Sequence, residues 1–308
     1  FTCLIRFFNY LYNNMNNCLL YLCLLVSCCV FSTANAIVAG GATNATGEEW
    51  TPITFGEVSD LFPDRDSGGA SLDENEIVGD ATYSGFYVNF DEGVVSDASD
   101  GTSFFRLRVS GLKNVNKGYQ GITYIGLDLD GDSALDFFVK ATANTISLVT
   151  ATGTNRNSPL VTASTTAFSV NGETFSAPTD SGNFSLATVA SIDGTPSDLD
   201  NNNGDDYFIS FAVDFDWIVE AANSLAGVTN FDETQGIGYV VSTSSKNDRF
   251  DADIAGVDGG IDSSSTFAAL GAIADPVTAG GTAVPESSAY ALLLGFVTGA
   301  TVLLRRRR

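Results

Sequence analysis

The chain has 308 residues, a formal net charge of −23 and no histidine. The lack of histidine excludes a Ser-His-Asp triad and a metal centre built on imidazole, and the acidic excess argues against nucleic acid as a partner, because phosphate binding needs a basic face. All five cysteines lie before residue 37, so the remainder of the chain has no disulfide and no thiol chemistry.

The first 36 residues have the layout of a secretory signal peptide. Met15, the only methionine, precedes an apolar stretch over residues 18–31, and the small-x-small sequence Ala34-Asn35-Ala36 follows that stretch. We therefore expect a leader over residues 1–36, with the true start at Met15 and export of the rest. The stretch Leu25-Val26-Ser27-Cys28 also fits a lipoprotein cleavage box, which is the alternative.

The middle of the chain has the pattern of short β-strands joined by turns. Residues 37–55 hold many small and polar side chains, and we expect a flexible lead-in there. From residue 56 to 274, runs rich in apolar and β-branched side chains alternate with Gly, Asn, Asp and Ser. The strands that this pattern predicts are 82–90, 103–110, 122–128, 135–142, 145–151, 183–190, 206–213 and 236–243.

Only residues 216–222 have a helical pattern in this region. Many short strands and almost no helix predict an all-β domain over residues 56–274, an antiparallel β-sandwich that is jelly-roll-like and has one short helix. Arg106 and Arg108 share one face of the strand predicted at 103–110, and we expect them to be structural and to pair with acidic loops. Trp217 is expected to pack in the core.

One loop between two predicted strands carries acids at a regular spacing: Asp128, Asp130, Asp132 and Asp136. Ca²⁺ takes about 6–8 oxygen ligands, and a tight loop with an acid at every second residue aims such oxygens inward. The spacing departs from that of an EF-hand in the place of Gly131, and strands flank the loop. We expect a structural Ca²⁺ here; the alternative is a solvated acidic turn, since Asp and Gly favour turns.

Two further acidic stretches are weaker candidates. The first precedes another predicted strand and offers oxygen ligands at looser spacing, so it is either a second cation site or a turn; its residues are Asp198, Asp200, Asn202 and Asp206. The second is expected on a solvated loop and comprises Asp248, Asp251, Asp253 and Asp258.

The last part of the chain has the pattern of a membrane anchor behind a spacer. Residues 275–285 contain Pro and Gly, and we expect a flexible linker there. An uncharged span of 18 residues, 287–304, follows and is about the minimum for a helix that crosses a bilayer. A basic tail would hold its end on the cytoplasmic side; it consists of Arg305, Arg306, Arg307 and Arg308.

Residues 284–308 together resemble the PEP-CTERM sorting signal of Gram-negative bacteria. The motif residues are Val284, Pro285 and Glu286, followed by the span and the basic tail, with Ser287 where the family has a second proline. The resemblance implies a single transmembrane helix, transient residence in the inner membrane, and processing near the motif by an exosortase. It also implies a final place at the cell surface or outside the cell, often in the exopolysaccharide or biofilm matrix.

The middle of the chain is similar to an uncharacterised group of β-rich domains that such proteins carry. The similar stretches are 62–66, 77–83, 105–108, 126–138, 206–211 and 266–272. This resemblance implies a sandwich with acidic loops and supplies no catalytic residues.

These observations predict a non-enzymatic surface or matrix protein with a calcium-stabilised sandwich. The first alternative is a carbohydrate-binding module for extracellular polysaccharide. The second is a glycosidase that works through two carboxylates, for which no spacing in the chain singles out a pair.

Overall fold

The computed structural model describes residues 50–55, 73–92, 97, 99–142, 145–152, 162–168, 184–189, 197–200, 204–247, 250, 252–257 and 266–284. The predicted leader (1–36), the motif residues Pro285 and Glu286, the span and the basic tail lie outside the described residues. Within the described part of the chain, we find no helix with the length and apolar character that crossing a membrane requires.

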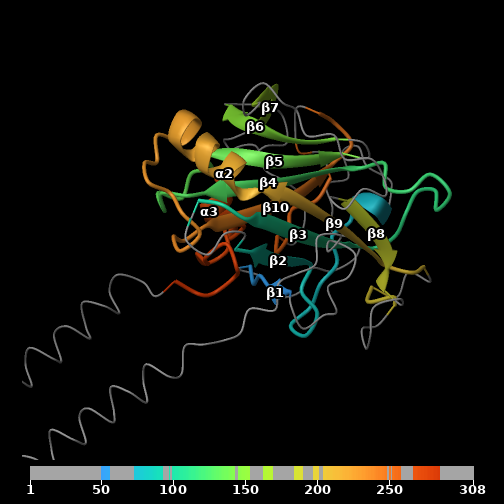
Figure 1. Ribbon diagram of the computed structural model, residues 1–308. Helices are drawn as coiled ribbons and strands as arrows, with labels where there is room; N and C mark the ends of the chain where they lie inside the picture. The colour runs from blue at the N-terminus through green and yellow to red at the C-terminus, as the bar shows by residue number, and fades with distance from the viewer. Residues whose placement is uncertain are drawn as a thin grey trace, which may run out of the picture. The chain divides into compact units, whose positions relative to one another are not determined.

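The described residues form ten strands in two five-stranded antiparallel sheets (Figure 1). The first sheet has the order β1 (Thr51–Pro52), β2 (Phe86–Asp91), β3 (Thr102–Val109), β9 (Tyr207–Asp214) and β8 (Phe184–Thr188). The second sheet has the order β10 (Gly238–Ser244), β4 (Ile122–Asp128), β5 (Phe137–Thr142), β6 (Ile146–Thr152) and β7 (Thr162–Phe168). In Figure 1 the second sheet lies above the first.

The two sheets pack face to face through one apolar core. On β3, the side chains of Phe105, Leu107 and Val109 belong to this core, as the alternation in the sequence predicts. The ring of Tyr239, on β10, lies 5.8 Å from the ring of Phe86 and 6.3 Å from that of Phe105, centroid to centroid. Because Tyr239 and the two phenylalanines belong to different sheets, the fold is a β-sandwich.

A smaller apolar cluster covers the outer face of the second sheet. The ring of Phe250 lies 5.3 Å from those of Tyr124 and Phe138 and 5.8 Å from that of Phe267. Phe267 opens α3 (Phe267–Leu270), whose first turn is capped by the hydroxyl of Thr266. The second sheet is therefore apolar on both faces.

The eight strands predicted from the sequence are all present, with ends that differ by a few residues. The predicted helix at 216–222 is α2 (Phe215–Ala221), and Trp217 is buried in the core as expected. The sequence pattern missed the strands β1 and β7 and three short helical segments: η1 (Asp73–Asn75), η3 (Ala222–Ala226) and α3. Residues 162–168 have few large apolar side chains, so their pattern does not predict a strand.

The strand order differs from the predicted jelly roll. Strands β1–β2–β3 and β4–β5–β6–β7 are meanders within one sheet each, whereas a jelly roll is built from two Greek keys. The sandwich is thus formed largely from local hairpins, and the chain changes sheet between β3 and β4, β7 and β8, and β9 and β10.

The described parts of two segments predicted to be flexible, residues 50–55 and 275–284, belong to the sandwich. Trp50, Ile53 and Phe55 of the lead-in are buried, and the Ile53 N–H donates to the Phe86 carbonyl at 3.0 Å. Of the linker predicted over 275–285, residues 275–284 are described, and the bridge between Ile237 and Val277 ties them to the fold through two backbone hydrogen bonds of 2.7 and 3.1 Å. Small side chains in these segments permit close packing. Composition alone does not show whether a stretch of small residues packs against the fold or remains flexible.

Replacing Gly281 and Gly227 by alanine, one at a time, tests whether residues 275–284 pack on the sandwich. Both glycines have left-handed φ angles, 78° and 71°, but a Cβ at Gly281 would lie 2.4 Å from the Cβ of Thr51, whereas no described atom lies within 4 Å of one at Gly227. We expect Gly227→Ala to cost about 1–2 kcal/mol through backbone strain, and Gly281→Ala to cost about 1–3 kcal/mol more through overpacking. Urea unfolding measures both, and equal losses would contradict the packing of residues 276–284 on β1.

Candidate metal sites

The hairpin between β4 and β5 positions the first acidic loop. Leu127 and Phe137 are register partners, and the Asp136 N–H donates to the Leu127 carbonyl at 2.8 Å. Because both strands are buried in the sandwich, this pair fixes the two ends of the loop. Asp128 is consequently buried and Asp136 half-buried, while residues 130–134 are exposed.

Three of the four predicted ligands in this loop converge. One carboxylate oxygen from each of Asp128, Asp130 and Asp136 lies within 4.8 Å of the other two. Two oxygens bound to one Ca²⁺ at about 2.4 Å can be at most about 4.8 Å apart, so the three can share an ion. Among the described residues, Asp132 is not part of this group; its Oδ1 accepts from the Ala134 N–H at 2.8 Å.

Backbone N–H groups orient the converging carboxylates. Asp128 accepts from Gly131 (2.8 Å) through Oδ1 and from Ser133 (3.0 Å) through Oδ2, and Asp136 accepts from Leu129 (2.8 Å) through Oδ2. Gly131 and Ser133 both have left-handed φ angles, 74° and 68°, which give the loop its tight course. A carboxylate oxygen can accept more than one partner, so these bonds leave capacity for a cation.

The loop concentrates negative charge at an electrostatic cost. Burial raises the pKa of Asp136 to about 6, and the neighbouring carboxylates of Asp130, Asp128 and Asp132 raise it further against the opposing hydrogen bond from Leu129. Burial likewise raises the pKa of Asp128. The metal-free loop therefore disfavours its own ionised form, and a bound divalent cation would remove that penalty.

The second acidic stretch also brings three carboxylates together. Oxygens of Asp198, Asp200 and Asp206 lie within 4.8 Å of one another. The Leu199 N–H donates to Asp206 Oδ2 at 3.0 Å, and the Asp206 N–H donates to the Ser197 carbonyl at 2.7 Å. Asn202, the fourth predicted ligand, lies outside the described residues.

Asp206 also pairs with Arg108, as the sequence suggested, whereas the Nε of Arg106, the other arginine of β3, donates to the Ser210 hydroxyl at 2.9 Å. Both Arg108 Nε, at 2.8 Å, and Nη2 donate to Asp206 Oδ2, and both side chains have 0% exposure. Burial raises the pKa of Asp206 to about 6 even though the hydrogen bonds and charge of Arg108 oppose the shift. The pair therefore joins the second acidic stretch to the first sheet without fully offsetting the burial of the carboxylate.

The sequence predicts the third acidic group on a solvated loop. The structure describes one member of that group, Asp253, and contradicts the prediction for it. Asp253 is buried, and its Oδ2 accepts from the Ile77 N–H at 2.7 Å while Oδ1 accepts from the Ile254 N–H at 2.8 Å. It thus ties residues 252–257 to a segment of the first sheet. Asp248, Asp251 and Asp258 lie outside the described residues.

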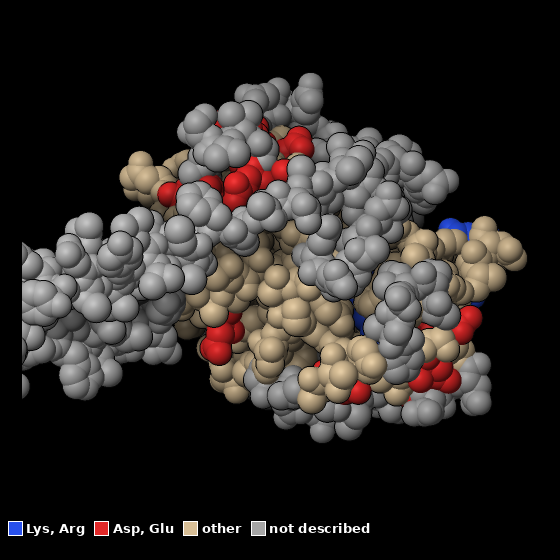
Figure 2. Space-filling view, turned by 60° about the horizontal axis from the view of Figure 1, so that its bottom comes forward, with Lys and Arg blue, Asp and Glu red and all other residues tan. Residues whose placement is uncertain are grey.

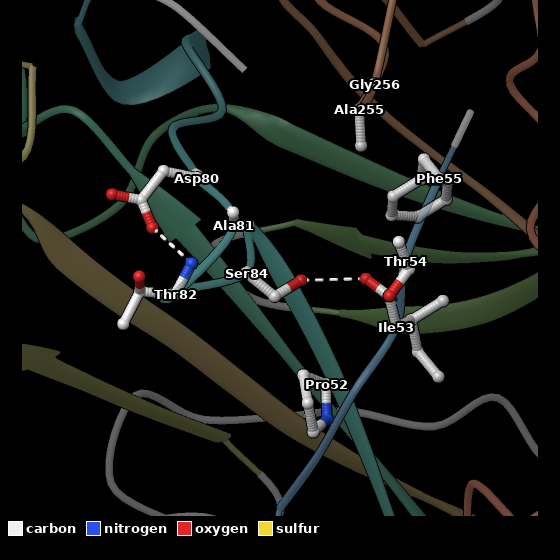
Figure 3. Close-up of a pocket in the computed structure, with 12 residues that line it drawn as sticks. Pro52, Ile53, Thr54, Phe55, Asp80, Ala81, Thr82, Ser84, Ala255 and Gly256 are labelled. Atoms are coloured by element: carbon white, nitrogen blue, oxygen red, sulfur yellow. Dashed lines mark hydrogen bonds between the residues drawn. The ribbon is translucent and has the colours of Figure 1, made fainter. Parts of the chain in front are cut away.

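A pocket lies between the N-terminal segment 52–55, the turn 79–85 and Ala255–Gly256 (Figure 3). Its volume is about 110 Å³, well below the roughly 300–1,000 Å³ of small-molecule sites. Asp80 is the only acid among the described residues that line it, and its Oδ1 already accepts from the N–H groups of Thr82 and Tyr83 at 2.7 Å. This pocket does not present the two facing carboxylates of a glycosidase.

The surface view in Figure 2 shows several separate groups of Asp and Glu on one face, with few Lys or Arg atoms. Among the residues whose burial the structure describes, no aromatic side chain is exposed; Tyr83, Tyr87, Phe90 and Tyr207 are half-buried and the others are buried. A row of exposed aromatic rings, which a sugar-stacking surface would need, is not present in that part of the chain.

No family model, no curated protein and no solved structure matches this chain.

Removing Arg108 should destabilise the protein strongly, because it leaves Asp206 as an uncompensated buried charge. We expect Arg108→Met to lower the free energy of unfolding by about 3–5 kcal/mol, measured by urea unfolding in the presence of chelator. The double variant Arg108→Met/Asp206→Asn should lose clearly less than the two single variants added together. Strict additivity would show that the two side chains do not interact.

The metal-free protein should become less stable as the pH rises from about 4 to about 6. The pKa of Asp136 is about 6 in the fold, whereas an unfolded aspartate titrates near about 3.9. In that window the folded state binds more protons than the unfolded chain, so the stability present below pH 4 is lost as the pH rises through 6. Urea midpoints in chelator measure the fall, which Asp136→Asn should reduce; a wild-type midpoint that rises over this range would contradict it.

Proposed function

We propose that this chain is a non-enzymatic protein of the cell surface or extracellular matrix whose β-sandwich is stabilised by Ca²⁺. The observation that carries the proposal is the convergence of Asp128, Asp130 and Asp136 at the β4–β5 hairpin. The ion holds the two strand ends together and offsets the charge that burial penalises there. Its role is structural: it stiffens the sandwich and takes no part in a reaction.

The donor set favours calcium over softer metals. All three side chains are carboxylates, and residues 37–308 contain neither cysteine nor histidine. Oxygen-only sites of this kind suit Ca²⁺ or Mg²⁺, whereas zinc and copper prefer sulfur and imidazole. Ca²⁺ accepts the flexible geometry of an exposed loop, while Mg²⁺ demands near-ideal octahedral coordination.

Export is the second part of the proposal, and it rests on the two ends of the sequence. The leader over residues 1–36 directs the chain across the inner membrane of a Gram-negative bacterium. The single span behind Val284-Pro285-Glu286 holds it there transiently, until an exosortase-type enzyme processes the tail. Extracellular calcium modules work with dissociation constants of about 10⁻⁴–10⁻³ M, so a weak loop site is suited to that compartment.

We prefer a binding or structural role to catalysis because of two features of the described residues, the small pocket and the burial of the aromatic rings. The pocket of Figure 3 has a single acid in its lining and little volume, which gives no support to a glycosidase. The absence of exposed aromatic rings among the described residues disfavours the sugar-stacking surface of a carbohydrate-binding module. Association with extracellular polysaccharide through other groups stays compatible with the proposal.

Calcium should raise the melting temperature of the protein relative to chelator. At a concentration of about 100 times the dissociation constant, one ion adds about 2.7 kcal/mol, which corresponds to roughly 5–10 °C for a domain of this size. Scanning calorimetry with Ca²⁺ and with EDTA measures the shift. Identical melting temperatures in the two buffers would remove calcium from the proposal.

Asp130→Asn and Asp132→Asn form a matched pair for this measurement. Both aspartates are exposed in the same loop, and both accept through Oδ1 from the N–H two residues ahead, at 3.0 and 2.8 Å. The asparagine oxygen preserves that bond, and each change removes one charge. Only Asp130 belongs to the converging group, so Asp130→Asn should reduce the calcium-induced shift and Asp132→Asn should leave most of it.

A further inference from the structure

The described residues of the loop before β9 share three features with the loop between β4 and β5. In each, the sequence Asp-Leu-Asp is followed by a third aspartate eight residues after the first: 128–130 with Asp136, and 198–200 with Asp206. In each, the leucine N–H donates to Oδ2 of the third aspartate, at 2.8 Å for Leu129 and 3.0 Å for Leu199. A buried strand begins at the next residue, Phe137 or Tyr207.

A buried oxygen without a hydrogen-bond partner points to a ligand in the second loop. Asp206 is 0% exposed, and its Oδ2 takes the donors from Arg108 and Leu199. Its Oδ1 is buried and has no hydrogen-bond partner. A buried carboxylate oxygen left without a donor is costly, and Asp206 belongs to the group in which Asp198 and Asp200 also bring carboxylate oxygens within 4.8 Å.

Charge balance indicates what would occupy this position. Three carboxylates meet there, and Arg108 offsets one of their negative charges. A divalent cation would add positive charge to this group beyond that of Arg108. Because the three side-chain donors are carboxylate oxygens, as in the first loop, the chemistry is that of Ca²⁺.

We propose that Asp198, Asp200 and Asp206 bind a second Ca²⁺, which takes the Asp206 oxygen that Arg108 leaves free. This ion fixes the entry of the chain into β9, which lies between β3 and β8 in the first sheet. The loop at 128–136 does the same for β4 and β5 in the second sheet. Each sheet then has a cation loop of its own.

The two sites are separate. Val109, at the end of β3, pairs with Tyr207 at the start of β9, and the chain from Val109 leads through residues 110–121 into the start of β4. The second loop therefore lies at the end of the sandwich where β4 begins, whereas the first loop lies where β4 ends (Figure 1). One ion cannot serve both.

Calcium stoichiometry tests the proposal, by equilibrium dialysis of the purified protein against Ca²⁺ followed by elemental analysis. We expect two ions per chain in the wild type and one in Asp198→Asn/Asp200→Asn, which keeps Asp206 and therefore its ion pair with Arg108. The control Asp132→Asn/Asp205→Asn removes two charges from the same two loops outside the converging groups, and it should still bind two ions. Asp130→Asn should weaken the first site alone.

The outcomes separate this inference from the proposed function. A wild type that binds one ion, which Asp130→Asn weakens and Asp198→Asn/Asp200→Asn leaves intact, overturns the second site and keeps the first. One ion that is lost only in Asp198→Asn/Asp200→Asn supports the second site and overturns the first. No bound calcium overturns both, and equal loss in the control variant would show that general charge, not ligation, holds the ions.

Discussion

Carboxylates at the ends of buried strands impose the main constraint on this protein. Asp128 closes β4 and Asp206 precedes β9, and both side chains are withdrawn from water by the sandwich. An ionised group in that position must be compensated, because desolvation favours its neutral form. Backbone N–H groups, one arginine and, by our proposal, two calcium ions supply the compensation. The course of both loops follows from that requirement.

The apolar core can tolerate this arrangement because the acids are kept at its edges. The aromatic contacts of Phe86, Phe105 and Tyr239 join the sheets in the centre, where no cation is needed. The loops leave the strands at opposite ends, so the negative charge is divided between two places. A sandwich with this net charge gains from such a division, since like charges repel one another less when they are far apart.

Meanders form part of each sheet, but β3 pairs with β9 and β4 pairs with β10, and further distant contacts hold the margins of the fold. The bridge between Ile237 and Val277, the bond from Ile77 to Asp253 and the bond from the Thr51 hydroxyl to the Gly280 carbonyl join segments far apart in sequence. These contacts bring the packed domain up to Val284, the first of the three residues that resemble a sorting motif. The described part of the predicted spacer belongs to the domain itself, so the proposed anchor would follow the packed fold with little free chain between them.

The sequence by itself determined the β class, eight strands and the acidic loop after β4, because alternation of side chains and the spacing of aspartates are local properties that survive in any tertiary context. It also held the repeat Asp-Leu-Asp with a third aspartate before β9, which a comparison of residues 128–136 with 198–206 reveals. Only the tertiary structure decided that Asp132 stays outside the converging group, that Arg108 pairs with Asp206 and that Asp253 is buried. Those outcomes depend on left-handed turns and on neighbours from distant strands. The packing of residues 275–284 was likewise decided by the tertiary structure, because a stretch of small residues has the same composition whether it packs or remains free.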